Sequence, residues 1–338
     1  MGPRVGRMPD APSFLSRKIT TQAVPFQVSY GRRRVGVPNA SESKFPWLNV
    51  VQYPFLTREF DTGEGWMSYV DHGQGRPIVF LHGSLTWSYL YRHLIRDLGR
   101  THRCIAPDLL GYGLSDKPQK IDYRPQAQAR RFADLMAYLR LEDVTLVAQC
   151  SGGPIALSWA IDHPEKVKNL VLINTWMWPL NDNVLARRTA RLVNHPINRF
   201  YYRLLPCNPM FILPALFADR HVIPKPVRIQ YMEPFKSFQD RFSVYGMVAG
   251  MTRSRRWFAE LWEKRERIAN KRTLLLWGAK DPMFGEEELQ RFQSMFRDCE
   301  AHPVESCGRL VPEEEPKIAS EAMRWFLMTH LAVGQGVG

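Results

Sequence analysis

The residues best suited to chemistry lie in the stretch Leu146–Ile155, which reads Leu-Val-Ala-Gln-Cys-Ser-Gly-Gly-Pro-Ile. This pattern predicts a buried strand, then a tight turn, then a helix. A sharply bent backbone needs small neighbours, and if Cys150 occupies the bend they are Ala148, Gly152 and Gly153. Ser151 fits less well, because Gln149 would then take the first small position. A thiol at a helix N-terminus is a candidate nucleophile, and the alternative is a buried, inert cysteine.

Two further segments could complete a catalytic site around this turn. The segment His82–Thr86 follows a predicted buried strand, and the N–H of Ser84 within it could serve an oxyanion hole. The N–H of Ser151 would be the second donor. Asp281 lies just past another predicted strand, where an acid that orients a catalytic partner is expected. The alternative for this aspartate is a turn residue before proline, and His82 is interpreted as structural.

Short apolar strands alternate with helices along most of the chain, which indicates an α/β fold with a mostly parallel sheet. An antiparallel pair is predicted first, at Phe55–Asp61 and Gly65–Asp71. The remaining predicted strands are Pro77–His82, Cys104–Asp108, Val144–Gln149, Asn169–Asn174, Thr273–Trp277 and Ala301–Glu305. The predicted helices are Thr86–Leu98, Ala127–Leu139, Gly153–Asp162 and Pro316–Leu331.

The alternation of strands and helices stops between residues 176 and 268, where the chain is aromatic-rich, interrupted by prolines and helical in character. We interpret residues 176–268 as an inserted helical cap over the carboxyl ends of the strands, where clefts form in open parallel sheets. The core is then residues 47–175 and 269–332. Residues 1–46 are basic and without periodicity, which is typical of a flexible arm.

Composition excludes several classes of protein. The 338 residues are 45% hydrophobic and 23% charged, as in globular proteins, and no apolar run is long enough for a membrane span. Five scattered cysteines argue against a disulfide framework and for a reducing, cytoplasmic location. Zinc-type spacing and glycine-rich phosphate loops are missing, so no metal or cofactor is predicted. The net charge of +13 comes without a nucleic-acid motif, and the basic arm could meet an acidic partner.

Seven motifs between about Tyr53 and Leu331 add a family resemblance. They are Tyr53-Pro54-Phe55, His82-Gly83-x-x-Thr86-Trp87-Ser88, Pro107-Asp108-Leu109-Leu110-Gly111-Tyr112-Gly113-Leu114-Ser115, Gln149-x-x-Gly152-Gly153-Pro154-Ile155, Asn174-Thr175-Trp176-Met177-Trp178-Pro179, Trp277-Gly278-x-Lys280-Asp281 and Val311-Pro312-Glu313-x-x-Pro316. Together they resemble the haloalkane dehalogenases of the α/β-hydrolase superfamily, in the subgroup whose acid follows the seventh strand. The resemblance implies an α/β-hydrolase fold with a helical cap over an apolar pocket, and we expect Trp87, Trp176 and Trp178 to contribute to substrate binding.

The chain departs from this family at the positions that do the chemistry. The resemblance implies a carboxylate nucleophile where this chain has Cys150, and a histidine base where it has Arg309. It implies a halide-binding tryptophan and asparagine at the positions of Ser151 and Ser84. Of these site positions, Asp281 alone keeps the residue type that the family pattern requires.

These departures argue against dehalogenation with turnover. A thiolate that displaced halide would form a thioether, which has no carbonyl for water to attack. The same objection applies to the related β-lactone decarboxylases, which also resemble this chain and use the carboxylate. Turnover through Cys150 should therefore be acyl transfer through a thioester, with the Ser84 and Ser151 N–H groups facing the oxyanion.

Arg309 leaves open whether the site turns over at all. Arginine stays protonated and cannot act as a general base. It can lower the pKa of Cys150, bind an anionic group, or pair with Asp281 in place of the usual bond between acid and histidine. One hypothesis is a slow Cys-dependent hydrolase or acyl-transfer enzyme for a small apolar ester or thioester. The other is a catalytically silent protein that binds a small apolar or anionic ligand.

Overall fold

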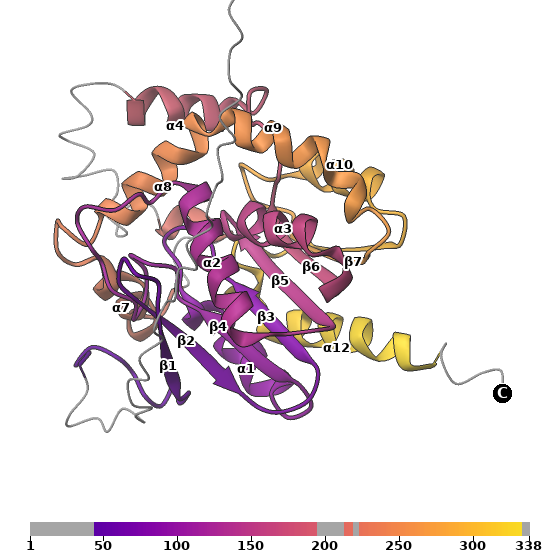
Figure 1. Ribbon diagram of the computed structural model, residues 1–338, viewed down its shortest axis with the longest axis horizontal. Coiled ribbons are helices and arrows are strands. Elements are labelled where there is room, and N and C mark those ends of the chain that lie inside the picture. Colours follow the sequence, from indigo (N-terminus) through magenta and orange to yellow (C-terminus); the bar gives the residue numbers. More distant parts are fainter. Residues whose placement is uncertain (1–43, 195–212, 219–222, 333–338) are drawn as a thin grey trace, which may run out of the picture. The chain divides into compact units, whose positions relative to one another are not determined.

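The computed structural model describes residues 44–194, 213–218 and 223–332, which belong to one compact unit of the chain. This unit contains an eight-stranded sheet (Figure 1). The strands are β1 Thr57–Asp61, β2 Trp66–His72, β3 Pro77–Leu81, β4 Arg103–Pro107, β5 Val144–Cys150, β6 Val167–Thr175, β7 Arg272–Gly278 and β8 Cys299–Val304. All predicted strands are present, each with bounds within two residues of the prediction. The predicted α/β class is confirmed.

The order of the strands in the sheet is β1-β2-β4-β3-β5-β6-β7-β8. The pairs β1–β2 and β2–β4 are antiparallel, and all other neighbours are parallel. The predicted antiparallel pair at the start of the chain is therefore confirmed. Because parallel strands end at the same edge of a sheet, the loops after β3, β5 and β7 come together there.

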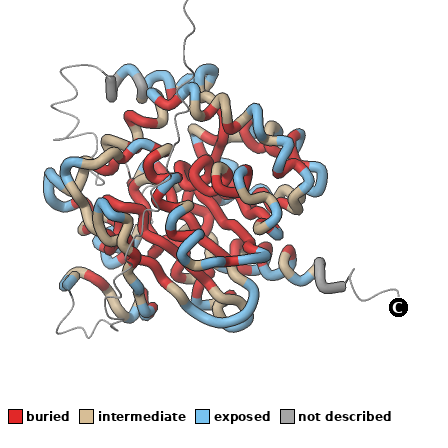
Figure 2. Tube along the Cα trace, viewed as in Figure 1, coloured by how far each residue is buried: buried red, intermediate tan, exposed pale blue. Residues whose placement is uncertain are grey.

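Helices cover both faces of the sheet, as the alternating pattern predicts. Helices α1 (Arg92–Leu98) and α12 (Pro316–Ala332) pack together on one face, and α2 (Pro125–Leu139) and α3 (Gly152–Asp162) on the other. Every residue of β5 is buried between these layers, and Figure 2 shows the buried residues gathered around the central strands. A further helix, α10 (Glu286–Met295), was not predicted, since it is short and mostly polar.

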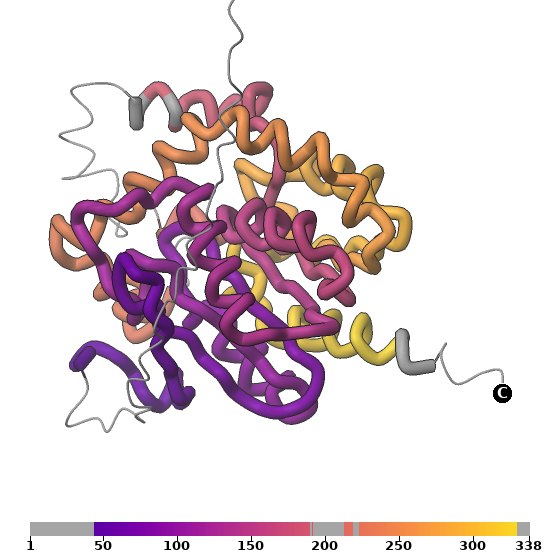
Figure 3. Tube along the Cα trace, viewed as in Figure 1, coloured from indigo at the N-terminus to yellow at the C-terminus, as the bar shows by residue number. Residues whose placement is uncertain are grey.

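The chain leaves β6, passes through several helices and returns to β7, which Figure 3 lets the reader follow by colour. These helices are α4 Val184–Asn194, α7 Lys225–Met232, α8 Phe242–Arg253 and α9 Arg255–Glu263. The described residues between β6 and β7 include short 3-10 turns but no strand. We call residues 176–268 the cap segment. Of the predicted arm, residues 1–43 lie outside the described residues.

One predicted helix starts later than expected. Thr86 belongs to a turn, because its N–H and its Oγ1 both donate to the carbonyl oxygen of Gly83. A 3-10 turn, η1 (Ser88–Tyr91), comes next and leads into α1. A short helix, α11 (Val311–Glu314), precedes α12. In the ranges that the structure describes, no helix combines the length and the apolar character needed to cross a membrane.

Candidate active site

Cys150 lies at the last residue of β5, where the chain turns sharply into α3. Its φ of +49° is in the left-handed region, which residues with a side chain rarely occupy and which is strained for most of them. A Cβ on Gly152 would lie 2.5 Å from backbone oxygens of the neighbouring loop, and one on Gly153 would lie 1.8 Å from Oγ1 of Thr175. The bend therefore falls at Cys150, and the glycines after it are needed to make room.

The loop after β3 passes directly beside the Cys150 side chain. A Cβ on Gly83 would lie 2.5 Å from the Cβ of Cys150, so glycine is required at this approach. The backbone N–H groups of Ser84 and Ser151 both lie close enough to the Cys150 sulfur to lower the pKa of the thiol. The Ser84 N–H also donates to Oγ of Ser151 at 2.8 Å, and the two serine hydroxyls lie 2.9 Å apart. The two predicted oxyanion donors thus lie beside the sulfur, and one of them, the Ser84 N–H, is already bonded to the Ser151 hydroxyl.

A buried ion pair lies next to the thiol. Nε and Nη2 of Arg309 donate to the two carboxylate oxygens of Asp281 at 2.9 and 2.7 Å, a bidentate arrangement. The exposed fractions of these side chains are 9% for Arg309 and 0% for Asp281. The guanidinium also lies near Cys150, where its charge lowers the pKa of the thiol, and its carbon lies 5.0 Å from the centre of the Phe284 ring. The three residues predicted to be catalytic therefore lie together.

The charges around Cys150 do not leave it as a thiolate. Burial raises the pKa of the thiol, Arg309 lowers it, and the carboxylate of Asp281 raises it again, with a net shift upward. The expectation that Arg309 lowers the pKa is right for its own contribution but wrong for the sum. Burial is the larger effect, and Asp281 offsets part of the arginine's charge. The thiol is thus protonated at rest.

His82 is not free to act as the missing base. Its Nδ1 donates to the carbonyl oxygen of Gly83 at 2.8 Å, and its Nε2 accepts the N–H of Leu109 at 3.0 Å. Burial lowers the pKa of His82 to about 4, so the ring is neutral. Both ring nitrogens are used, which agrees with the structural role predicted for this histidine. Arg309 keeps its proton: burial lowers its pKa, but Asp281 and Cys150 together raise it by more.

Comparison with known proteins connects this geometry to a family. The α/β-hydrolase fold family matches residues 76–316. Haloalkane dehalogenase 2 of Mycobacterium tuberculosis is 31% identical over 285 residues, which cover 81% of this chain and 96% of that protein. The chain belongs to the haloalkane dehalogenase group of the α/β-hydrolases.

Other relatives show how wide this group is. The cis-3-alkyl-4-alkyloxetan-2-one decarboxylase of Shewanella oneidensis is 29% identical over 279 residues, covering 77% of this chain and 85% of that protein. Among solved structures, a haloalkane dehalogenase from Agrobacterium tumefaciens matches with a TM-score of 0.70 and 25% identity, covering 80% and 96% of the two chains. Relatives of this dehalogenase group thus carry the names of different reactions, and the chemistry of this chain has to be argued from its own residues.

Of the three predicted pocket tryptophans, Trp176 is the one that the structure connects to the buried pair of Arg309 and Asp281. It is fully buried and stacks on Phe284, with 4.9 Å between ring centres. Phe284 in turn contacts the Arg309 guanidinium. The indole Nε1 of Trp176 has no hydrogen-bond partner among the described residues. A buried donor without a partner is costly unless a ligand completes it.

The other two predicted tryptophans have different surroundings. The indole Nε1 of Trp87 donates to the carbonyl oxygen of Gln230 at 2.9 Å, so that donor is already used. Trp178 packs against the rings of Trp262 and Phe292, at 5.2 and 4.8 Å between centres. The structure brings Trp176 to the site, and it places Trp87 and Trp178 in aromatic clusters.

Two polar residues that the sequence analysis did not single out hold the site together. Nε2 of Gln149 donates to the carbonyl oxygen of Arg309 at 3.2 Å, which fixes the loop that carries the arginine. The side chain of Asn174 donates to the carbonyl oxygen of Gly278 at 3.0 Å and accepts its N–H at 2.8 Å. Asn174 thereby ties the end of β6 to the segment that carries Asp281. Both residues lie in motifs of the dehalogenase resemblance, and membership in those motifs was the sequence signal that could have identified them.

Proposed function

We propose that this chain is a slow Cys-dependent hydrolase or acyl-transfer enzyme that acts on a small apolar ester or thioester. The observation that carries the proposal is the convergence on Cys150 of a strained bend, two backbone N–H donors and the Arg309 guanidinium. Donors aimed at a developing negative charge are what acyl transfer requires. The cap segment would cover the apolar pocket, and the N–H of Trp176 would meet the polar end of the substrate.

In the proposed reaction, the sulfur of Cys150 bonds to the carbonyl carbon, and the bond from that carbon to the leaving oxygen or sulfur breaks. The thiol proton passes through water to the leaving group. The N–H groups of Ser84 and Ser151 bind the carbonyl oxygen after the Ser151 hydroxyl turns aside. Water then cleaves the thioester, which releases the acid and returns a proton to Cys150. Both steps are slow, since a missing general base typically costs about 10²–10⁴-fold in rate.

Dehalogenation with turnover is not proposed, although relatives carry that name. A haloalkane could transfer its alkyl group to Cys150 once, with loss of halide and of the thiol proton. The resulting thioether has no carbonyl carbon for water to attack, so the chain would not be regenerated. We therefore expect 1-bromobutane to modify Cys150 at most once per chain.

A second candidate is a catalytically silent protein that binds a small apolar or anionic ligand at the same place. The raised pKa of Cys150 and the bidentate pair of Arg309 with Asp281 favour this candidate, because no group in contact with the thiol takes its proton. The unpartnered N–H of Trp176 would then serve binding alone.

An ester with a coloured leaving group separates the two candidates. With p-nitrophenyl butyrate, the enzyme should release p-nitrophenolate in a burst of one equivalent per chain, before slow turnover. Intact-mass spectrometry should find the butyryl group on Cys150. The variant Cys150→Ala should lose both signals, and Cys299→Ala, which removes another thiol that is partly exposed, should keep them. A chain that never carries the butyryl group would support the silent binder instead.

Restoring a base gives a second test of the enzyme. In Arg309→His, an imidazole would stand beside Asp281 where the family has its base, and the slow phase should accelerate by about 10²-fold. If the slow phase in Arg309→His is as slow as in the parent chain, acylated Cys150 is not an intermediate of turnover.

The location and the arm complete the proposal. A reducing, cytoplasmic location would keep Cys150 a thiol, as the free cysteines of the described residues allow. The basic arm, residues 1–46, would bind an acidic partner. Deleting the arm should weaken retention on heparin and leave acylation of Cys150 unchanged. Unchanged retention would remove this role for the arm.

A further inference from the structure

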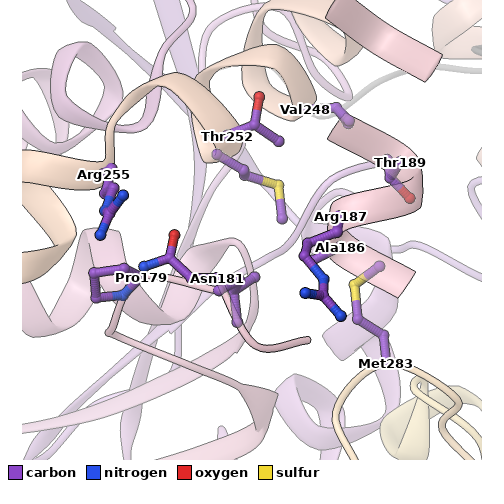
Figure 4. Close-up of a pocket in the computed structure, with 11 residues that line it drawn as sticks. Pro179, Asn181, Ala186, Arg187, Thr189, Val248, Thr252, Arg255 and Met283 are labelled. Atoms are coloured by element: carbon purple, nitrogen blue, oxygen red, sulfur yellow. The ribbon is translucent and has the colours of Figure 1, made fainter. Parts of the chain in front are cut away.

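A pocket of about 270 Å³ lies in the cap segment, and neither Cys150, Asp281 nor Arg309 lines it. Its walls come from the residues after β6, from α4 and α8, and from Arg255 at the start of α9 (Figure 4). Met283, from the loop after β7, closes it on the side of the core. The pocket is thus separate from the candidate active site, and a ligand bound in it would be independent of the function proposed for Cys150.

The chemistry of the walls is divided between apolar and cationic groups. Val248, Met251 and Met283 supply an apolar surface. Arg187 and Arg255 reach the pocket from different elements, as Figure 4 shows. Neither arginine forms an ion pair with any residue that the structure describes, in contrast to their neighbour Arg256, which pairs with Glu260 at 3.0 Å. The pocket therefore presents two guanidinium groups without a counter-charge.

The walls of the pocket are tied together by hydrogen bonds. Nδ2 of Asn183 donates to the carbonyl oxygen of Met283 at 2.7 Å and to Oε1 of Glu288 at 3.0 Å. Its Oδ1 accepts the N–H of Ala186 at 2.9 Å, within the first turn of α4. Asn183 thus joins the start of α4 to the loop of the core, so the pocket exists before a ligand binds. Binding to a preformed site costs little ordering.

We propose that this pocket binds a small amphiphilic anion, such as a carboxylate or sulfonate with a short alkyl chain. The alkyl chain would lie on Val248, Met251 and Met283, where it leaves water. The acid group would accept hydrogen bonds from Arg187 and Arg255, which present the planar donor groups that suit carboxylates. A cationic ligand would meet two positive charges, and a neutral one would gain no charge-assisted hydrogen bond from either arginine.

Titration calorimetry on the full chain tests this directly, with octanoate as the probe and with octanol and octylammonium as ligands of the same length. Octanoate should bind, and the other two should bind more weakly by at least about tenfold, as expected when a charge-assisted contact is lost. The double variant Arg187→Gln, Arg255→Gln should weaken octanoate binding by a similar factor. The matched control Arg188→Gln, Arg256→Gln removes the same charge from the same two helices, at positions that do not line the pocket, and should change binding by less than about twofold.

Three results would overturn the proposal. Octanol could bind as tightly as octanoate, or both double variants could behave alike. Octanoate binding could also disappear in Cys150→Met, which fills the other site, and persist in the variant that lacks Arg187 and Arg255. Phosphatidylglycerol vesicles provide the last arm. If vesicles retain the chain through Arg188 and Arg256 as strongly as through the pocket arginines, and free octanoate does not bind, the arginines belong to a lipid-facing surface.

Discussion

Two buried pairs of arginine and carboxylate in this molecule have similar geometry and different surroundings. Arg309 donates to Asp281 at 2.9 and 2.7 Å, and Arg92 likewise donates from both terminal nitrogens to Glu313, one of them at 2.7 Å. Each guanidinium also packs on an aromatic ring, at 5.0 Å from the ring centre for Arg309 and 4.0 Å for Arg92. The side chains in both pairs are less than a tenth exposed.

The difference lies in what the remaining donors and acceptors do. The hydroxyl of Tyr231 donates to Glu313 at 2.6 Å, and Arg92 donates to the carbonyl oxygen of Tyr89 at 3.2 Å. The hydrogen bonds of the pair of Arg92 and Glu313 are thus made within the fold, and they link α1, α11 and α7. The charge of Arg309 instead acts on the nearby thiol of Cys150 and lowers its pKa. A buried pair whose groups are all bonded within the fold acts as a structural link, and one whose cation acts on a reactive atom can serve binding or catalysis.

The largest effect is expected from breaking the structural link. Arg92→Met should lower the free energy of unfolding by about 3–5 kcal/mol, because it leaves the Glu313 carboxylate buried without its counter-charge. Urea denaturation measures this loss. The rate at which iodoacetamide alkylates Cys150 in the folded variant should stay as in the parent chain. A change in that rate would show that the two pairs are coupled and would break the comparison.

A buried carboxylate without a bonded arginine sharpens the comparison. Asp108 accepts the N–H groups of Ser88 and Leu114, and burial raises its pKa to about 6. The folded state therefore holds the proton of Asp108 more tightly, and this group alone makes stability fall as pH rises from about 4 to 6, by about 3 kcal/mol. His82, whose pKa burial lowers to about 4, has the opposite sign, so its contribution rises between about pH 4 and 6.5.

The contributions of Asp108 and His82 to the pH dependence of stability nearly cancel in the parent chain. Removing the Asp108 carboxyl group should therefore leave the contribution of His82 visible. In Asp108→Asn the falling contribution disappears, so the free energy of unfolding should rise from pH 4 to 6.5 by about 3 kcal/mol more than in the parent. Urea denaturation of both proteins at several pH values gives the two curves, and titrations common to both cancel in their difference. Parallel curves would mean that Asp108 is ionised in the fold and needs no arginine.

The sequence was sufficient for the sheet and for the bend at Cys150, because alternation and small residues are local signals. It also predicted that Asp281, Arg309 and Cys150 meet, because the family resemblance places them at the positions of its acid, base and nucleophile. The net pKa shift of Cys150 could not be predicted, since it depends on burial and on charges from two separate loops. The contact between the hydroxyl groups of Ser84 and Ser151 could not be predicted either, because packing sets the direction of a hydroxyl group.

A smaller effect, on the reactivity of Cys150, should distinguish the pair of Arg309 and Asp281 from the pair of Arg92 and Glu313. Arg309→Met should cost as much stability as Arg92→Met, for the same reason. It should also raise the pKa of Cys150 further, because Arg309 is the group that lowers it most. A rise of one pH unit would slow alkylation at pH 8 by about tenfold. The alkylation rate of the folded variant across pH 7–10 measures the shift. An unchanged profile would mean that the guanidinium does not act on the sulfur.

The smallest effect is expected where the same chemistry is exposed to water. Arg256 pairs with Glu260 at 3.0 Å, one turn apart on α9, but the arginine side chain is 94% exposed. Arg256→Gln should change the free energy of unfolding by at most about 0.5 kcal/mol, and salt should reduce even that difference. Urea denaturation at low and high salt checks both statements. A loss as large as that in Arg92→Met would mean that the contact between the charges sets the energy. If the small change is found, burial explains why the other two pairs contribute so much more to stability. Burial then also explains why the charge of Arg309 acts on Cys150, since little water lies between them to screen it.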